Sequence, residues 1–186
     1  MLAIPRGGVV VGAAAAPAIG AELDVAVPAK VRAPSQPELA IGAVAPDGTL
    51  WLDAEAVRSL AIPPEILEAQ VEGARREVDR RTTAFRGDRP PPEVADRPVV
   101  VVDDGIATGA TILATARSIR GLGASLLVIG VPVAPRSSLG RLGEEVDRVV
   151  CLASPEPFFA VGQWYEDFRQ VDDDAVRQVL AARSTD

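Results

Sequence analysis

The segment that decides the fold reads Val99-Val100-Val101-Val102-Asp103-Asp104-Gly105-Ile106-Ala107-Thr108-Gly109-Ala110-Thr111. Its four valines form an apolar run without alternation, which is typical of a strand buried on both faces of a parallel sheet. Two carboxylates follow at the end of this strand. Because side chains alternate along a strand, both cannot point into the core, and burying unpaired charges is very costly. We therefore expect Asp103 and Asp104 to face a solvated cleft.

The loop after the acidic pair is rich in small and hydroxylated residues, and a predicted helix follows it. Small residues let the backbone close around an anion, and the first N–H groups of a helix carry the positive end of its dipole. Thr108 and Thr111 add hydroxyl donors, while the carboxylates can accept from vicinal sugar hydroxyls directly or through a divalent metal. The segment predicts a diol site beside a phosphate site, as a ribose 5-phosphate requires. The alternative is an ordinary helix N-terminus whose acidic pair is merely solvated.

Strands and helices alternate on both sides of this segment, which indicates a parallel α/β sheet. In such sheets ligands bind beyond the carboxyl ends of the strands, so the loops that leave strands are the informative ones. The expected strands are 2–4, 23–27, 99–102, 125–133 and 146–152, with a hairpin formed by 39–45 and 49–52. The expected helices are 9–23 (kinked or broken at Pro17), 65–85, 135–144 and 172–182, and a further helix follows the Gly/Thr loop and ends at about 121. The expected loops are 28–37 and 87–98, and the segment 155–168 is expected to be irregular.

The composition excludes several classes of protein. The length of 186 residues favours one domain over 1–186, and the absence of histidine excludes Ser-His-Asp and zinc-hydrolase chemistry. A net charge of −7 makes nucleic acid a poor candidate partner. The sequence contains neither a run as long as a membrane span nor a signal peptide, and with Cys151 alone it can form no internal disulfide. The default expectation is a cytoplasmic protein that does not contact membranes.

The segment 99–111 resembles the signature with which type I phosphoribosyltransferases bind 5-phosphoribosyl 1-diphosphate (PRPP): a hydrophobic strand, two acidic residues and a loop ending Thr-Gly-x-Thr. The resemblance implies a three-layer fold, with a parallel sheet between two layers of helices and a small hood region at about 32–86. It also implies a homodimer. The implied reaction transfers the phosphoribosyl group to a nitrogenous base, with a purine-like base as one candidate, and releases pyrophosphate. The competing interpretation is a non-catalytic regulatory module that binds PRPP or a nucleotide, because a fold does not fix an activity.

The resemblance also assigns roles within the signature. Asp103 and Asp104 would bind the ribose diol and Mg²⁺, and the loop from Ala107 through Thr108, Gly109 and Ala110 to Thr111 would bind the 5-phosphate. Many 6-oxopurine enzymes of the family carry an aspartate where this chain has Ala107. This departure argues against hypoxanthine or guanine as the acceptor. The chain also begins within its first predicted strand, which could leave one edge of the core uncovered.

Two basic loops are candidates for the diphosphate. Pro5-Arg6-Gly7-Gly8 follows the first predicted strand, where the glycines allow close backbone approach and Arg6 can grip a diphosphate with two donors. A structural turn is the alternative interpretation, but in the resemblance this is the pyrophosphate loop. Lys30 leaves the second predicted strand, where the family uses a basic residue to help hold pyrophosphate. The alternative for Lys30 is a solvated surface charge.

Arginines cluster on the predicted helix 65–85. Helical spacing places Arg76 and Arg80 on one face, from which they could close over the diphosphate. We favour a solvated face that is ion-paired with nearby glutamates. The arginines are Arg75, Arg76, Arg80 and Arg81, and the glutamates are Glu72 and Glu77.

The aromatic segment 157–168 is the expected acceptor region, with Phe159, Val161 and Trp164 as its binding residues. An aromatic face stacks well on a flat ring, and backbone groups can read the edges of that ring. The alternative is that the aromatics pack this segment against the sheet. The segment loosely resembles the Phe-Val-Gly…Asp segment of purine phosphoribosyltransferases. It is one residue longer before Asp167, which argues against a metal-side role for that residue.

Overall fold

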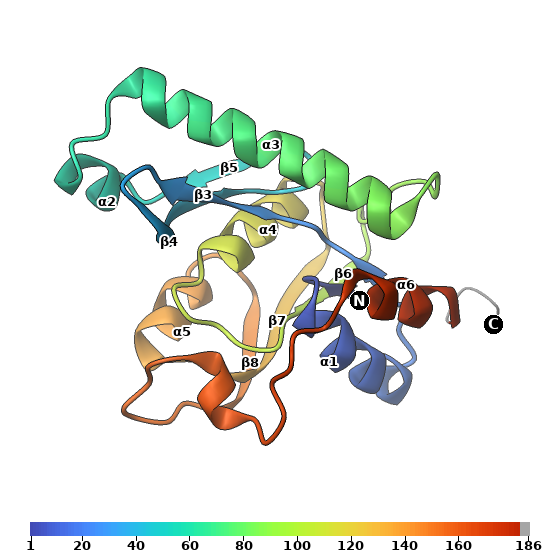
Figure 1. Cartoon of the computed structure of the whole chain (residues 1–186). Coiled ribbons are helices and arrows are strands. Elements are labelled where there is room, and N and C mark those ends of the chain that lie inside the picture. Colours follow the sequence, from blue (N-terminus) through green and yellow to red (C-terminus); the bar gives the residue numbers. More distant parts are fainter. Residues whose placement is uncertain (183–186) are drawn as a thin grey trace.

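A computed structural model describes residues 1–182, and these residues form two separate sheets (Figure 1). The main sheet has five strands in the order β2-β1-β6-β7-β8, and every neighbouring pair is parallel. Its strands are β1 (Leu2–Ala3), β2 (Asp24–Val25), β6 (Pro98–Val102), β7 (Leu126–Val133) and β8 (Arg148–Ala153). Because β1 and β6 are adjacent and parallel, the loops that leave them emerge at the same edge of the sheet.

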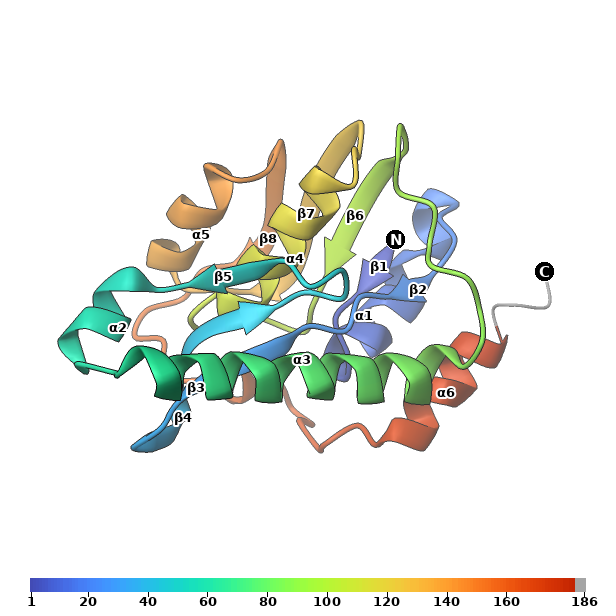
Figure 2. The same ribbon diagram turned by 90° about the horizontal axis from the view of Figure 1, so that it is seen from above.

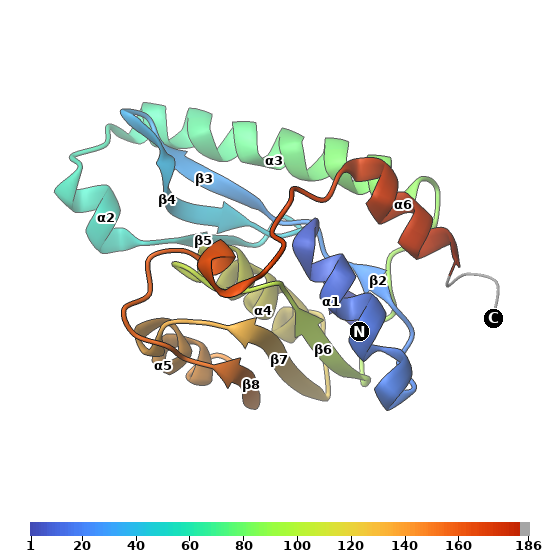
Figure 3. The same ribbon diagram turned by 60° about the horizontal axis from the view of Figure 1, so that its bottom comes forward.

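Helices cover both faces of the main sheet, so the predicted α/β architecture is confirmed (Figure 3). Successive side chains of β6 point to opposite faces of the sheet, which explains this arrangement. Val99 and Val101 pack among residues of α4 and α5, while Val102 packs among residues of α1 and α6. The strand is therefore buried on both faces, as its unbroken valine run predicts. The helices are α1 (Gly7–Ala15), α4 (Ala110–Gly121), α5 (Arg136–Gly143) and α6 (Asp173–Ala182).

The second sheet and two helices form a layer that we call the hood. Its antiparallel strands are β3 (Ala29–Ala33), β4 (Gln36–Val44) and β5 (Leu50–Leu52), and its helices are α2 (Ala54–Ser59) and α3 (Pro64–Arg86). Figure 2 shows α3 running alongside these strands. The apolar stripe of α3 packs Val71 and Val78 against Val31 and Ile41 of the hood sheet. Ala114 of α4 packs with Ala43 of β4 and with Ala45 just after that strand, which places the hood on the main layer.

The structure corrects several predicted elements. The segment 28–37, expected to be a loop, contains β3 and the start of β4. In β3 buried and exposed residues alternate, with Ala29 and Val31 buried and Lys30 exposed. The prolines on both sides of this short strand made the segment look like a loop. Helix α2 was not predicted, although Asp53 caps it through backbone N–H groups of residues 55 and 56 at 3.1 and 3.0 Å.

Other predicted boundaries hold, with local changes. The break at Pro17 is confirmed, because α1 ends at Ala15 and a 3-10 turn, η1 (Pro17–Ile19), follows. The hairpin between β4 and β5 is also confirmed. The segment expected to be irregular contains one 3-10 turn, η2 (Val161–Trp164). No helix within residues 1–182 combines the length and the hydrophobicity that crossing a bilayer requires.

Candidate functional site

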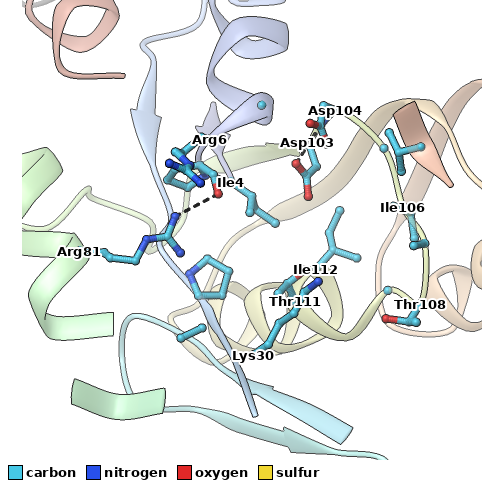
Figure 4. A pocket seen from close by; sticks show the side chains of 18 of the residues that line it. Ile4, Arg6, Lys30, Arg81, Asp103, Asp104, Ile106, Thr108, Thr111 and Ile112 are labelled. Atoms are coloured by element: carbon cyan, nitrogen blue, oxygen red, sulfur yellow. Dashed lines mark hydrogen bonds between the residues drawn. The ribbon is translucent and has the colours of Figure 1, made fainter. Parts of the chain in front are cut away.

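A cavity of about 560 Å³ lies at the carboxyl edge of the main sheet, beneath the hood (Figure 4). Its walls come from the loop after β1, the segment after β6, strand β3, one face of α3 and the C-terminal segment 161–168. The strand order changes direction at β1 and β6, because β2 lies on one side of this pair and β7 on the other. Such a switch point is where open α/β sheets bind ligands.

The acidic pair lies in this cavity at the end of β6. The backbone N–H of Asp104 donates to Oδ1 of Asp103 at 2.9 Å. Asp103 lines the cavity, and burial raises the pKa of its carboxyl group well above the usual range; the neighbouring carboxylate of Asp104 adds to the effect. Burial also raises the pKa of Asp104. Two carboxylates in this environment favour a bound cation or hydroxyl donors that offset their charge.

The first turn of α1 presses directly against the acidic pair. A Cβ atom on Gly7 would lie 1.8 Å from Oδ2 of Asp104, so a residue with a side chain cannot occupy this position without displacing the carboxylate. A Cβ atom on Gly8 would likewise lie 2.8 Å from the carbonyl oxygen of Val102, at the end of β6. The Pro5-Arg6-Gly7-Gly8 loop and the acidic pair, almost a hundred residues apart in sequence, therefore belong to one site.

The N-terminus of α4 is uncapped and lies at the cavity. Among residues 1–182 no side chain caps the helix, and its first backbone hydrogen bond runs from Leu113 to Gly109 at 2.9 Å, so the N–H groups of 110–112 have no partners within the helix. Two side chains of α5 hold the loop from the far side. Ser138 Oγ donates to the carbonyl of Ala107 at 2.8 Å, and Arg141 donates to the carbonyl of Thr108 at 2.6 Å. Thr108, Gly109 and Thr111 line the cavity.

Four basic side chains line the cavity although the chain carries a net charge of −7. They are Arg6, Lys30, Arg32 and Arg81. Figure 4 shows Arg6 and Arg81 on one side of the cavity and Thr108 on the other. Arg81 donates to the Pro5 carbonyl at 3.4 Å and is 20% exposed. Burial lowers the pKa of its guanidinium, with Glu77 opposing and Arg6 adding to the shift, yet an arginine stays charged at neutral pH.

Arg81 was not predicted to line the cavity, whereas two other arginines of its cluster behave as predicted. Arg75 pairs with Glu72 and Arg80 pairs with Glu77 on the exposed face of α3, which confirms the preferred interpretation for these two arginines. Arg81 instead points into the cavity. The helical spacing of the sequence could have indicated this position, because residues 70, 74, 77 and 81 lie on one face of α3 and all line the cavity.

The C-terminal segment contributes differently from the prediction. Val161 lines the cavity, but Phe159 is 83% exposed and Trp164 stacks on Phe158 with ring centroids 6.3 Å apart, and neither is in the cavity wall. Phe168, which was not singled out, is in that wall. Tyr165 anchors the segment because its hydroxyl donates to the backbone carbonyl of Asp104 at 2.5 Å, and burial raises the pKa of that hydroxyl.

Comparison with known proteins gives a consistent picture. Residues 1–165 match the family model described as phosphoribosyl transferase domain. Two Mycobacterium tuberculosis proteins, from strains CDC 1551 / Oshkosh and ATCC 25618 / H37Rv, are each named "putative phosphoribosyl transferase". Each is 42% identical over 176 residues, which is 95% of this chain but 40% of the relative, so this chain spans less than half the length of these relatives. The crystal structure of TT1426 from Thermus thermophilus is 39% identical, with a TM-score of 0.80, and the match covers 97% of this chain and 86% of that one.

Proposed function

Because this chain belongs to the phosphoribosyl transferase domain family, we propose that it transfers the 5-phosphoribosyl group of PRPP to a ring nitrogen of a small base and releases pyrophosphate. One observation carries the proposal. A single cavity combines a carboxylate pair, an uncapped helix N-terminus and a basic wall. These three features suit the ribose diol, the 5-phosphate and the diphosphate of one PRPP molecule.

The proposed assignment follows the walls of the cavity. Asp103 and Asp104 accept hydrogen bonds from the ribose hydroxyls, and the loop 107–111 donates backbone and hydroxyl hydrogens to the 5-phosphate. The first turn of α1, with Arg6 and its two glycines, binds the diphosphate together with Lys30. We add Arg81 to this group because it lies beside the Pro5–Arg6 loop. On the acceptor side we retain Val161 and leave out Phe159 and Trp164, which lie outside the cavity wall.

The site suits Mg²⁺ as a cofactor that binds with the substrate. Within residues 1–182 no three His, Cys, Asp or Glu side chains gather as a metal cage. Mg²⁺ is commonly held by one or two carboxylates with phosphate and water oxygens completing its shell, and Asp103 and Asp104 offer such a pair. When bound, Mg²⁺ supplies positive charge that stabilises the leaving diphosphate.

The proposed chemistry requires little covalent work from the protein, which suits a chain without histidine. The bond between the anomeric carbon and the diphosphate oxygen breaks, and the diphosphate leaves with the electron pair. The bond between that carbon and the acceptor nitrogen forms, and the nitrogen loses its proton. The residues of the cavity hold both reactants in line and stabilise the charge that develops on the leaving group.

Product analysis by mass spectrometry tests the proposal. The protein is incubated with PRPP, Mg²⁺ and a pool of purine and pyrimidine bases, and we expect a new nucleoside monophosphate that names the acceptor. If PRPP binds by calorimetry but no product forms, the result favours the regulatory interpretation or an acceptor outside the pool. If PRPP does not bind, the proposed site itself is contradicted.

A further inference from the structure

We propose that the ring of Phe168 is the surface on which a planar, unsaturated acceptor ring stacks. This inference rests on the proposed function and adds a residue and a substrate class to it. Of the aromatic side chains within residues 1–182, Phe168 is the one that lines the cavity. Val161 also lines the cavity, and it packs against Gly105, which directly follows the acidic pair that we assign to the sugar.

The segment that carries Phe168 is fixed to the site at several points. Ser154 Oγ donates to the carbonyl of Ala134 at 2.8 Å, where the segment leaves β8. Val161 packs so closely on Gly105 that a Cβ atom there would lie 2.5 Å from its Cγ1 atom. The hydroxyl of Tyr165 holds the Asp104 carbonyl at 2.5 Å. The segment is therefore positioned by the same residues that form the acidic end of the cavity.

The ring of Phe168 packs against Gly162 and Tyr165, yet about half of the side chain stays exposed. A Cβ atom on Gly162 would lie 2.6 Å from Cδ1 of Phe168, so the glycine leaves the space that the ring occupies. The ring of Tyr165 lies against it, with centroids 5.2 Å apart and an angle of 41° between the planes. Nevertheless, Phe168 remains 49% exposed. A ring that is held by its neighbours and remains exposed in a cavity wall offers a preformed stacking surface, because little conformational freedom is lost on binding.

The other exposed rings of this segment do not have these properties. Phe159 is 83% exposed outside the cavity wall, and its backbone N–H is tied to Gln163 Oε1 at 3.0 Å. The ring of Trp164 already stacks on the ring of Phe158. An aliphatic amine would gain little binding affinity from a phenyl ring. A flat heteroaromatic ring stacks on a phenyl ring whatever hydrogen-bond donors and acceptors lie along its edge. The geometry therefore favours a planar base over an aliphatic amine as the acceptor.

Calorimetry with three probes isolates the contribution of the ring. Ribose 5-phosphate reports on the sugar and phosphate contacts alone, while AMP and UMP add a purine or a pyrimidine base. In the wild-type protein we expect at least one nucleotide to bind more tightly than ribose 5-phosphate. Phe168→Ala should lower the affinity for that nucleotide by roughly tenfold to a hundredfold, which is the usual effect of removing a stacking aromatic side chain. The affinity for ribose 5-phosphate should stay unchanged.

Three further variants keep the test decisive if Phe168→Ala loosens the segment. Phe168→Leu retains apolar volume without a ring and should lose the nucleotide advantage, whereas Phe168→Tyr should keep it. Phe159→Ala tests the other phenylalanine of the segment. If that variant no longer binds the nucleotide more tightly than ribose 5-phosphate, the inference is overturned. An advantage that survives in both Phe168→Ala and Phe168→Leu would also overturn it.

Two outcomes for the wild-type protein separate this inference from the proposed function. If ribose 5-phosphate binds but neither nucleotide binds more tightly, the stacking surface is rejected and the sugar phosphate site stands. If none of the three probes binds, the proposed function fails and the inference falls with it. Thermal melting of each variant by circular dichroism identifies any that is unfolded.

Discussion

Arg81→Ala should weaken pyrophosphate binding while leaving ribose 5-phosphate binding intact. The polar contacts of the Arg81 guanidinium with residues 1–182 are long, 3.4 Å to the Pro5 carbonyl and 3.9 Å to Glu77, and its side chain is 20% exposed. A charged donor in such a position can satisfy an anion at little cost. Hydrogen bonds to charged groups contribute about 1.5–3 kcal/mol, which corresponds to a loss of roughly tenfold to a hundredfold in affinity.

The assay is calorimetric titration of Mg²⁺-pyrophosphate and, separately, of ribose 5-phosphate. Arg81→Lys should give an intermediate loss, because an ammonium group lacks the planar fork of a guanidinium. Arg81→Met separates charge from packing, since it keeps an apolar stem where the guanidinium lies 5.6 Å from the centre of the Phe85 ring. Arg75→Ala is the matched control: this arginine lies on the same helix, is paired with Glu72 and does not line the cavity.

The reasoning is refuted if Arg81→Ala and Arg81→Met both bind pyrophosphate as tightly as the wild-type protein. An equal loss for pyrophosphate and ribose 5-phosphate would refute it too, because that result would indicate a general collapse of the cavity rather than the loss of one anion contact. An effect of similar size in Arg75→Ala would show that net charge, and not position, controls the affinity.

Three further predictions concern stability and the loop after β6. Burial raises the pKa of Asp103 in the folded protein, so the free energy of unfolding should fall as pH rises from the pKa of an unfolded aspartate, about 3.9, through the raised pKa of the folded state. At a pH above this range Mg²⁺ should raise Tm, and at a pH below it Mg²⁺ should leave Tm unchanged. Ser138→Ala leaves the Ala107 carbonyl without its donor, so chemical denaturation should reveal a loss of about 1–3 kcal/mol, and ribose 5-phosphate should bind more weakly; unchanged affinity would separate the loop from the phosphate site. Arg86→Ala breaks a buried pair with Asp24 (2.7 Å) and should lower the free energy of unfolding by about 3–5 kcal/mol, and a loss under about 1 kcal/mol would contradict this.

The features that the sequence predicts well are local ones. The segment 99–111 carries strand, acidic pair, loop and helix start in consecutive residues, so its geometry follows from hydrophobic pattern and helix physics alone. The break at Pro17 and the apolar stripe of α3 are local in the same sense. Strand β3 was missed because it is short and flanked by prolines, and its alternating Lys30 and Arg32 resemble a polar loop.

The features that the sequence could not reveal depend on contacts between distant elements. Arg81 meets Pro5 across 76 positions, and Ser138 supports Ala107 across 31. The choice between Phe159 and Phe168 depends on how η2 turns the chain, which neither hydrophobicity nor spacing encodes. The predicted homodimer stays a prediction from the family resemblance.

The most direct test of the central claim is PRPP binding to the wild-type protein and to the double variant Asp103→Asn, Asp104→Asn, measured by calorimetry in the presence of Mg²⁺. Asparagine keeps the size of each side chain and removes the charges that would bind the ribose hydroxyls and the metal. We predict that the wild-type protein binds PRPP and that the double variant, still folded by circular dichroism, loses affinity by at least about a hundredfold, as expected when several charge-assisted contacts are removed. Equal affinity in the two proteins would contradict the account, because it would leave the acidic pair without a role in the site.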